Sequence, residues 1–272
     1  MEELNEGLGT VYEKLMLNDL FEKLIKKYNI KSILEAPIWG MSGIPGMNSF
    51  IFSKKKLDVT LLDNNRDRIN KIKEYWKHVN LNPKIDYVND FSKLPLDDNS
   101  YDLVWNFSAL WYHKNADKIV EELVRVSKNL VLISVTNRWQ PGYFMRKFWL
   151  DKDFFKTINE EWTSATKIKK ILKKNNIKII DESVIDVPPF PDTCMPIGDL
   201  LKKLGIKQKK SDKKNTWHWT TMKYYSGIDD ELPKKIAKYT FIEKFPIPWQ
   251  MKIIWSHHHY ILGQKIEKNS AK

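Results

Sequence analysis

The sequence predicts an α/β fold in which a mostly parallel sheet of seven strands carries helices on both faces. Apolar, strand-sized segments alternate with amphipathic helical segments over residues 12–135, and this alternation is typical of parallel strands joined by crossover helices. A chain of 272 residues is long enough for one such core with an added insertion. The longest apolar run, 130–135, is only strand-sized, so we expect no membrane-spanning helix.

The individual elements follow from the spacing of apolar residues. Leu20, Phe21 and Leu24 recur at helical spacing within 12–28 and predict the first helix. Further helices are expected at 48–53, 66–78, 116–127 and 163–175. Strands are expected at 31–36, 58–63, 84–88, 101–105, 130–135 and 177–187, with a closing strand over 251–265.

Residues 188–250 interrupt this alternation. The segment is rich in proline and holds Trp217, Trp219 and a lysine cluster, and long excursions of this kind in compact domains are usually lids or binding loops. We therefore expect an α/β domain built from 1–187 and 251–272, with 188–250 as a cap over the binding site.

Composition constrains the partners and the compartment. The net charge is +12, but only five of the 46 basic residues are arginines, whereas specific phosphate and base recognition favours arginine. A solvated basic surface is therefore expected before a nucleic-acid footprint. The single cysteine, Cys194, excludes an intramolecular disulfide, and the acidic N-terminus is unlike a secretory signal, so we expect a cytoplasmic protein.

Polar and glycine residues follow successive expected strands. In open α/β sheets ligands bind beyond the carboxyl ends of the strands, and a carboxylate there can accept both hydroxyls of a ribose. A glycine-rich loop lets the backbone approach a ligand closely. The residues at these strand ends are Glu35, Gly40 and Gly43 after the first strand, Asp63 and Asn64 after the second, Asp90 and Phe91 after the third, and Asn106 and Phe107 at the fourth.

This pattern resembles the class I S-adenosylmethionine-dependent methyltransferases, which have a Rossmann-like sheet of seven strands. The resemblance rests on Ile33–Ala36, Val59–Asp63, Val88–Pro95 and Ser100–Asn106. It implies that the first loop holds the methionine moiety, Asp63 the ribose, and the pair Asp90 and Phe91 the adenine. The expected cofactor contacts are Tyr12, Glu35, Gly40, Gly43, Asp63, Asn64, Asp90, Phe91, Asn106 and Phe107.

The first loop departs from the family pattern. Pro37 and Trp39 stand where the family has its first two glycines, and glycines come later, at 40, 43 and 46. The loop is therefore expected to take a longer path around the cofactor.

The acceptor side is expected near the end of the fourth strand and under the cap. His113 and His218 are candidate general bases, and Trp111, Trp217 and Trp219 are candidate substrate contacts. These aromatic residues favour a small-molecule or lipid-like acceptor. No metal site is expected, because the run His257–His259 has no carboxylate beside it in the sequence.

Three alternatives remain open from the sequence. An RNA or DNA methyltransferase would use the lysines of 202–214 with Trp217 and Trp219, although no recognisable RNA-binding module accompanies them. A nicotinamide-dependent oxidoreductase would need Gly-x-Gly-x-x-Gly directly after the first strand, and that spacing is absent. The third is a protein that binds S-adenosylmethionine without catalysis. The oligomeric state is left open.

Overall fold

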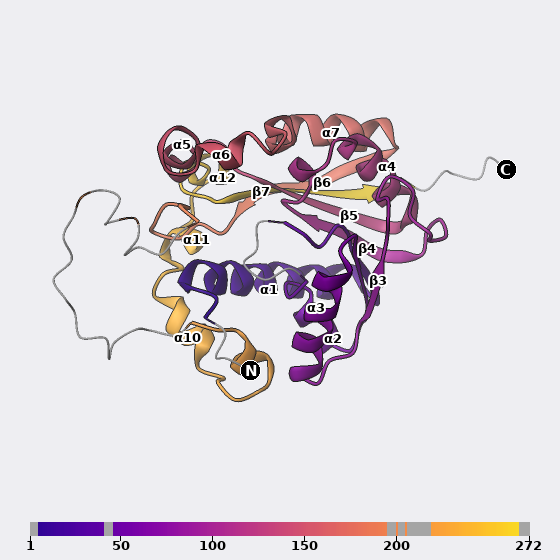
Figure 1. Ribbon diagram of the computed structural model, residues 1–272, viewed down its shortest axis with the longest axis horizontal. Coiled ribbons are helices and arrows are strands. Elements are labelled where there is room, and N and C mark those ends of the chain that lie inside the picture. Colours follow the sequence, from indigo (N-terminus) through magenta and orange to yellow (C-terminus); the bar gives the residue numbers. More distant parts are fainter. Residues whose placement is uncertain (1–4, 41–45, 195–199, 201–204, 206–218, 267–272) are drawn as a thin grey trace.

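The core of the protein is one seven-stranded sheet, seen near the middle of Figure 1. The computed structural model describes residues 5–40, 46–194, 200, 205 and 219–266. The strand order is β3-β2-β1-β4-β5-β7-β6; β1 to β5 pair in parallel, and β7 is antiparallel to both β5 and β6. The strands are β1 (Ser32–Glu35), β2 (Asp58–Asp63), β3 (Lys84–Tyr87), β4 (Tyr101–Phe107), β5 (Ser127–Thr136), β6 (Ile177–Ile185) and β7 (His258–Lys265). The predicted mostly parallel, seven-stranded sheet is confirmed.

Helices cover both faces of the sheet (Figure 1). One face packs against α1 (Leu8–Tyr28), α2 (Phe50–Lys54) and α3 (Arg66–His78), and the other against α4 (Ala116–Val126) and α7 (Ala165–Lys174). Each face therefore has its own apolar core, which accounts for the apolar character of the central strands. The shorter helices are η1 (Leu110–Tyr112), α5 (Pro141–Met145), η2 (Arg146–Leu150), α6 (Lys152–Phe155), η3 (Glu160–Thr163), α9 (Met222–Tyr225), α10 (Leu232–Ala237), α11 (Phe241–Lys244) and α12 (Trp249–Lys252).

The second βα unit shows how the sequence fixes a local boundary. The strand β2 ends at Asp63, and α3 begins two residues after Asn64. The side chain of Asn65 accepts a hydrogen bond from the amide of Arg68 and caps the helix. Both elements have the predicted bounds.

The closing strand is shorter than predicted. Residues 249–252 form α12, and β7 begins only at His258, so the expectation of a strand from 251 was wrong. The intervening turn is held by Asn137, whose side-chain amide donates to the carbonyls of Ile253 and Ser256. These carbonyls are therefore not available for pairing in the sheet.

The described part of 188–250 packs beside α1. Met222, Leu232 and Ile236 join the apolar core on the α1 face, and the Tyr225 hydroxyl hydrogen-bonds with the side chain of Asn18 on α1. Whether the whole segment forms a cap stays a prediction.

Candidate functional site

Asp63 lies at the carboxyl end of β2, where its side chain is buried. Arg68 donates to both of its carboxylate oxygens, from Nε to Oδ2 at 2.5 Å and from Nη2 to Oδ1 at 2.6 Å. The backbone amide of Asn65 adds a third hydrogen bond to Oδ1. The ring of Trp39 lies 4.4 Å from the Arg68 guanidinium, so the first loop covers this pair. Asn64, by contrast, is exposed.

The start of the first loop is tied to the end of β4. The side-chain amide of Asn106 donates to the carbonyls of Ala36 and Pro37, and its oxygen accepts from the amide of Ala109. A Cβ on Gly40 would lie 2.1 Å from the Phe107 carbonyl oxygen, so only glycine permits this approach. Asn106 and Gly40 thus shape the loop itself. Gly43 lies outside the described residues.

Glu35, at the end of β1, faces the core. It accepts a hydrogen bond of 2.6 Å from Ser49, whose hydroxyl also accepts from the indole of Trp105. Burial raises the pKa of Glu35 to about 8, against the opposing effects of the Ser49 hydrogen bond and of Lys14. The carboxyl group is therefore largely protonated at neutral pH and ties β1 to the helix that follows.

Phe91 and His113 adjoin one another beyond β3 and β4. Their rings meet edge to face at 5.4 Å, while Asp90 is exposed and bonded to Ser92. Burial lowers the pKa of His113, opposed by the charge of Asp63. This contact places His113 beside Phe91, which is predicted to meet the adenine; the role of His113 as a general base stays a prediction.

Two buried side chains near these strand ends have unused hydrogen-bonding capacity. Both amide atoms of Asn48, which is 1% exposed, and Nε2 of His113 have no hydrogen-bond partner among the described residues. Buried polar atoms are normally paired, so these atoms fit a bound polar ligand. Sequence reasoning missed Asn48 and Arg68; the position of Asn48 between the glycine loop and α2 was its only signal.

The remaining predicted residues have partners in several different parts of the chain. Tyr12 donates to Glu243 at 3.1 Å, and Phe107 packs on His258 with 4.4 Å between ring centroids. Trp111 is 3% exposed and packs on Phe154. Trp219 is half-buried and packs against the core on the α1 face. Trp217 and His218 lie outside the described residues.

Carboxylates surround the histidine run, contrary to the expectation from sequence. His257 bonds Asp186 at 2.8 Å, His258 bonds Glu13 at 3.2 Å, and His259 is 3.1 Å from Glu182. The carboxylates come from α1 and β6, which are distant in sequence. The premise used to exclude a metal site was therefore wrong.

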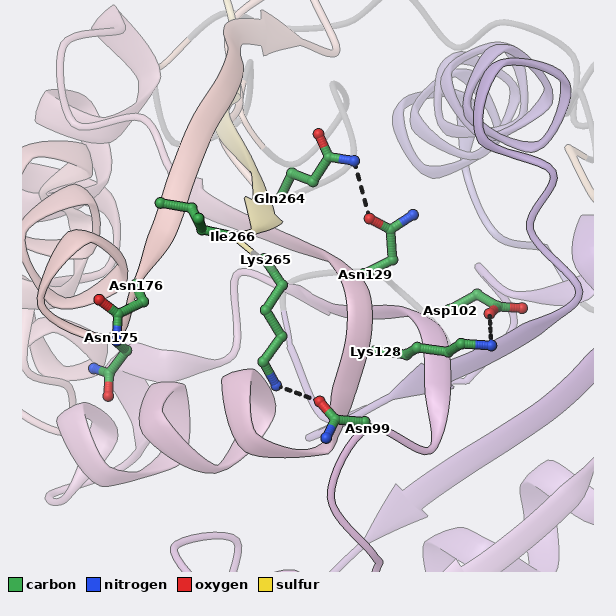
Figure 2. A pocket seen from close by; sticks show the side chains of 9 residues that line it. All are labelled: Asn99, Asp102, Lys128, Asn129, Asn175, Asn176, Gln264, Lys265 and Ile266. Carbon is green, nitrogen blue, oxygen red and sulfur yellow. Dashed lines mark hydrogen bonds and ion pairs between the residues drawn. The ribbon is translucent and has the colours of Figure 1, made fainter. Parts of the chain in front are cut away.

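A cavity of about 880 Å³ lies at the opposite ends of the central strands from Asp63 and Asn106 (Figure 2). It adjoins the amino ends of β4 and β5, where Lys265 bonds Asn99 and Gln264 bonds Asn129. The predicted cofactor residues lie at the carboxyl ends, so this cavity is separate from them.

A family model described as a methyltransferase domain matches residues 42–133, from the first loop to β5. Comparison with curated proteins yields no match.

Three solved structures share the fold. The chain is similar to a candidate sarcosine dimethylglycine methyltransferase from Galdieria sulphuraria (TM-score 0.55, 14% identity, 92% of this chain and 86% of that chain). It is similar to the YcgJ protein from Bacillus subtilis (TM-score 0.52, 13% identity, 92% and 98%). It is also similar to magnesium protoporphyrin IX methyltransferase from Synechocystis PCC 6803 with bound SAH (TM-score 0.50, 14% identity, 64% and 78%).

The family match covers the strands whose ends carry Asp63, Phe91 and Asn106. The sheet around them has the seven-stranded order found above. Residues 42–133 therefore match a methyltransferase domain, and the seven-stranded sheet around them has the fold of the two methyltransferase structures named above.

Proposed function

We propose that the protein methylates a small, lipid-like acceptor that reaches the cofactor from an exposed aromatic surface. This aromatic surface consists of residues on the segment after β5 and on the turn before β7. Their side chains are between 44% and 62% exposed. They are Trp139, Phe144, Phe148, Trp149, Met251, Ile254 and Trp255.

Hydrogen bonds join the two segments of the aromatic surface. Asn137, two residues before Trp139, bonds the carbonyls of Ile253 and Ser256, which flank Ile254 and Trp255. In Figure 1 the helices α5 and α12 accordingly lie at the same end of the molecule. That end carries the carboxyl end of β5, and Asp63 and Asn106 lie at the carboxyl ends of other strands of the same parallel set. The surface is therefore beside the edge expected to hold the cofactor.

Exposed aromatic clusters of this size are unfavourable in water unless they meet an apolar partner. Cationic groups accompany the rings. Arg138 lies 5.2 Å from the Trp139 ring, and Lys147, which pairs with Glu160 at 2.7 Å, lies 5.7 Å from the Phe148 ring. Aromatic side chains mixed with cations suit an amphipathic molecule with an anionic group. This combination is the observation that carries the proposal.

Within the described residues, no helix combines the length and the apolar character that crossing a bilayer requires.

S-adenosylmethionine, when bound, supplies an electrophilic methyl group on its sulfonium. The chain's own contribution is to position the two reactants. Asp63 would hold the ribose, Phe91 and His113 would flank the adenine, and Asn48 would meet the methionine end. Alignment of the acceptor with the methyl group then provides most of the rate, since holding two reactants together is itself worth several kcal/mol, roughly 7–11 at best.

The test is an acceptor screen that measures S-adenosylhomocysteine release. Candidate acceptors are water-soluble metabolites, lipids dispersed in mixed micelles, and RNA. We expect turnover with a lipid, reduced about tenfold or more in the double variant Phe148→Ser/Trp149→Ser by loss of apolar contact area. Ile228, 74% exposed on the turn between α9 and α10, provides the matched control Ile228→Ser, which should retain full activity. Turnover with only RNA or a polar metabolite, undiminished in the double variant, would overturn the proposal.

A further inference from the structure

Three buried side chains from separate parts of the chain converge beside β7. They are Glu13 of α1, Asp186 just after β6, and His258 at the start of β7, and they are 6%, 2% and 2% exposed. We call them the acid–histidine cluster. One ligand atom from each lies within 4.8 Å of the others. Nε2 of His258 is 3.2 Å from Glu13 Oε2 and 4.0 Å from Asp186 Oδ2.

The topology explains this convergence. Because β7 runs antiparallel to β6, the start of β7 lies beside the end of β6, with Ile185 opposite His258. This pairing brings Asp186 next to the histidine. The helix α1 packs over the same end of β6 and supplies Glu13.

Two oxygens of the cluster have no partner. Oε1 of Glu13 and Oδ1 of Asp186 are buried, and neither has a hydrogen bond within the part of the chain that the structure describes. A buried carboxylate oxygen without a partner is costly. These two oxygens are therefore available to a ligand.

Neighbouring residues orient two of the three side chains. Ser108 Oγ lies 2.9 Å from Nδ1 of His258, which leaves Nε2 facing the two carboxylates. His257 engages Oδ2 of Asp186 at 2.8 Å and leaves Oδ1 available. Metal-binding histidines usually have such a hydrogen bond on the second ring nitrogen. Ligands at about 2.0–2.2 Å from an ion lie roughly 3–4 Å from one another, and Nε2 of His258 lies within that range of both carboxylates.

We propose that Glu13, Asp186 and His258 bind one divalent transition-metal ion, with Zn²⁺ and Mn²⁺ as the ions to test. An imidazole with two carboxylates suits these ions, whereas Mg²⁺ and Ca²⁺ prefer oxygen ligands alone. Three protein ligands also leave coordination positions open. The site is independent of the acceptor proposed above.

The experiment uses the full-length, untagged protein after removal of metal by a chelator. Titration calorimetry with Zn²⁺ and with Mn²⁺ should show one site. Each of Glu13→Gln, Asp186→Asn and His258→Gln should weaken that site by about a hundredfold or more. His259→Gln is the matched control, because His259 is the next residue of β7 and pairs with Glu182 instead. It should bind as the unchanged protein does.

A second measurement identifies the ligand directly. In His258→Cys, bound Co²⁺ should give a thiolate-to-metal charge-transfer band that the unchanged protein, which retains Cys194, does not give. No binding by the folded protein would overturn the proposal. So would binding that survives all three substitutions, binding that His259→Gln also abolishes, or absence of the charge-transfer band in a His258→Cys protein that still binds Co²⁺. If the three substituted proteins fail to fold, the band alone decides.

Discussion

Arg68, in the first turn of α3, donates hydrogen bonds from its guanidinium to both carboxylate oxygens of Asp63, at the end of β2. The side chain of Asp63 is 1% exposed and that of Arg68 is 19% exposed. The carboxylate is therefore fixed in place and neutralised at the end of β2. The hydroxyl groups of a ribose at this position would meet a hydrogen-bond acceptor, the Asp63 carboxylate, whose orientation is already set.

The first prediction concerns the carboxylate. Asp63→Ala should weaken S-adenosylhomocysteine binding at least tenfold, because it removes charge-assisted hydrogen bonds worth about 1.5–3 kcal/mol. Calorimetry measures the affinity, and circular dichroism checks the fold. Asp58→Ala, at the exposed start of the same strand, should bind normally. Unchanged affinity in a folded Asp63→Ala protein would remove Asp63 from the site.

The second prediction tests whether Arg68 acts through Asp63. Arg68→Ala alone should weaken cofactor binding, because the carboxylate loses the partner that orients it. In the Asp63→Ala background the same substitution should have almost no effect. A double-mutant cycle on the cofactor affinity therefore gives a coupling energy between the two residues. Additive effects would mean that Arg68 contacts the cofactor itself.

His113 has two candidate roles that kinetics can separate. If it contacts the adenine, His113→Phe should raise the cofactor Kd about tenfold, the cost of one lost hydrogen bond, and retain kcat at saturating cofactor. If it is a general base, kcat should fall by about a hundredfold or more with little change in Kd. The edge-to-face contact with Phe91 favours the first result. The matched control is His78→Phe, at the exposed end of α3, which should change neither Kd nor kcat.

The fourth prediction concerns the glycine at the start of the loop. In Gly40→Ala the added Cβ meets the Phe107 carbonyl oxygen, so the loop must move. We expect the free energy of unfolding to fall by about 1–3 kcal/mol and cofactor binding to weaken. In Gly9→Ala the added Cβ meets only Phe190, at 3.9 Å, so this matched variant should be as stable as the parent. Equal stability of the two variants, by urea unfolding, would contradict the expectation.

Glu35 should give stability a specific pH dependence. Its pKa is raised by burial to about 8 in the folded protein, above the roughly 4.3 of an unfolded glutamate. The folded state therefore holds more protons between these values, and stability from this group falls as pH rises through them, by up to about 1.4 kcal/mol per pH unit. Glu35→Gln should remove that part of the slope. If the free energy of unfolding, measured with urea from pH 5 to pH 8, changes equally with pH in both proteins, Glu35 is not the group responsible.

Sequence reasoning was accurate where the determinants are local. The strand β2 and the helix α3 have their predicted bounds because an apolar run ends in a polar turn and Asn65 caps the helix. Prediction from the sequence failed where segments that are distant along the chain meet. The residues 251–256 have the apolar character of a strand, but Asn137 takes up the carbonyls of the turn.

The residues of the candidate site were likewise predictable only where the signal is local in the sequence. Asp63 and Phe91 follow directly from strand ends, and the structure places both at the carboxyl edge of the sheet. The partners of the histidine run were not predictable, since Glu13 and His258 are 245 positions apart. No periodicity or motif spacing reports a contact of that kind.

The helix α1 has a consequence for how the chain folds. Its residues Tyr12, Glu13 and Asn18 bond Glu243, His258 and Tyr225, across separations of 231, 245 and 207 positions. Contacts between such distant positions require closure of long loops, which slows folding. During synthesis α1 precedes these partners by more than 200 residues, so its polar side chains find them only after that length of chain has been made. Completion of the native state therefore waits for the C-terminal segment, and a nascent chain lacking β7 leaves Glu13 without its histidine.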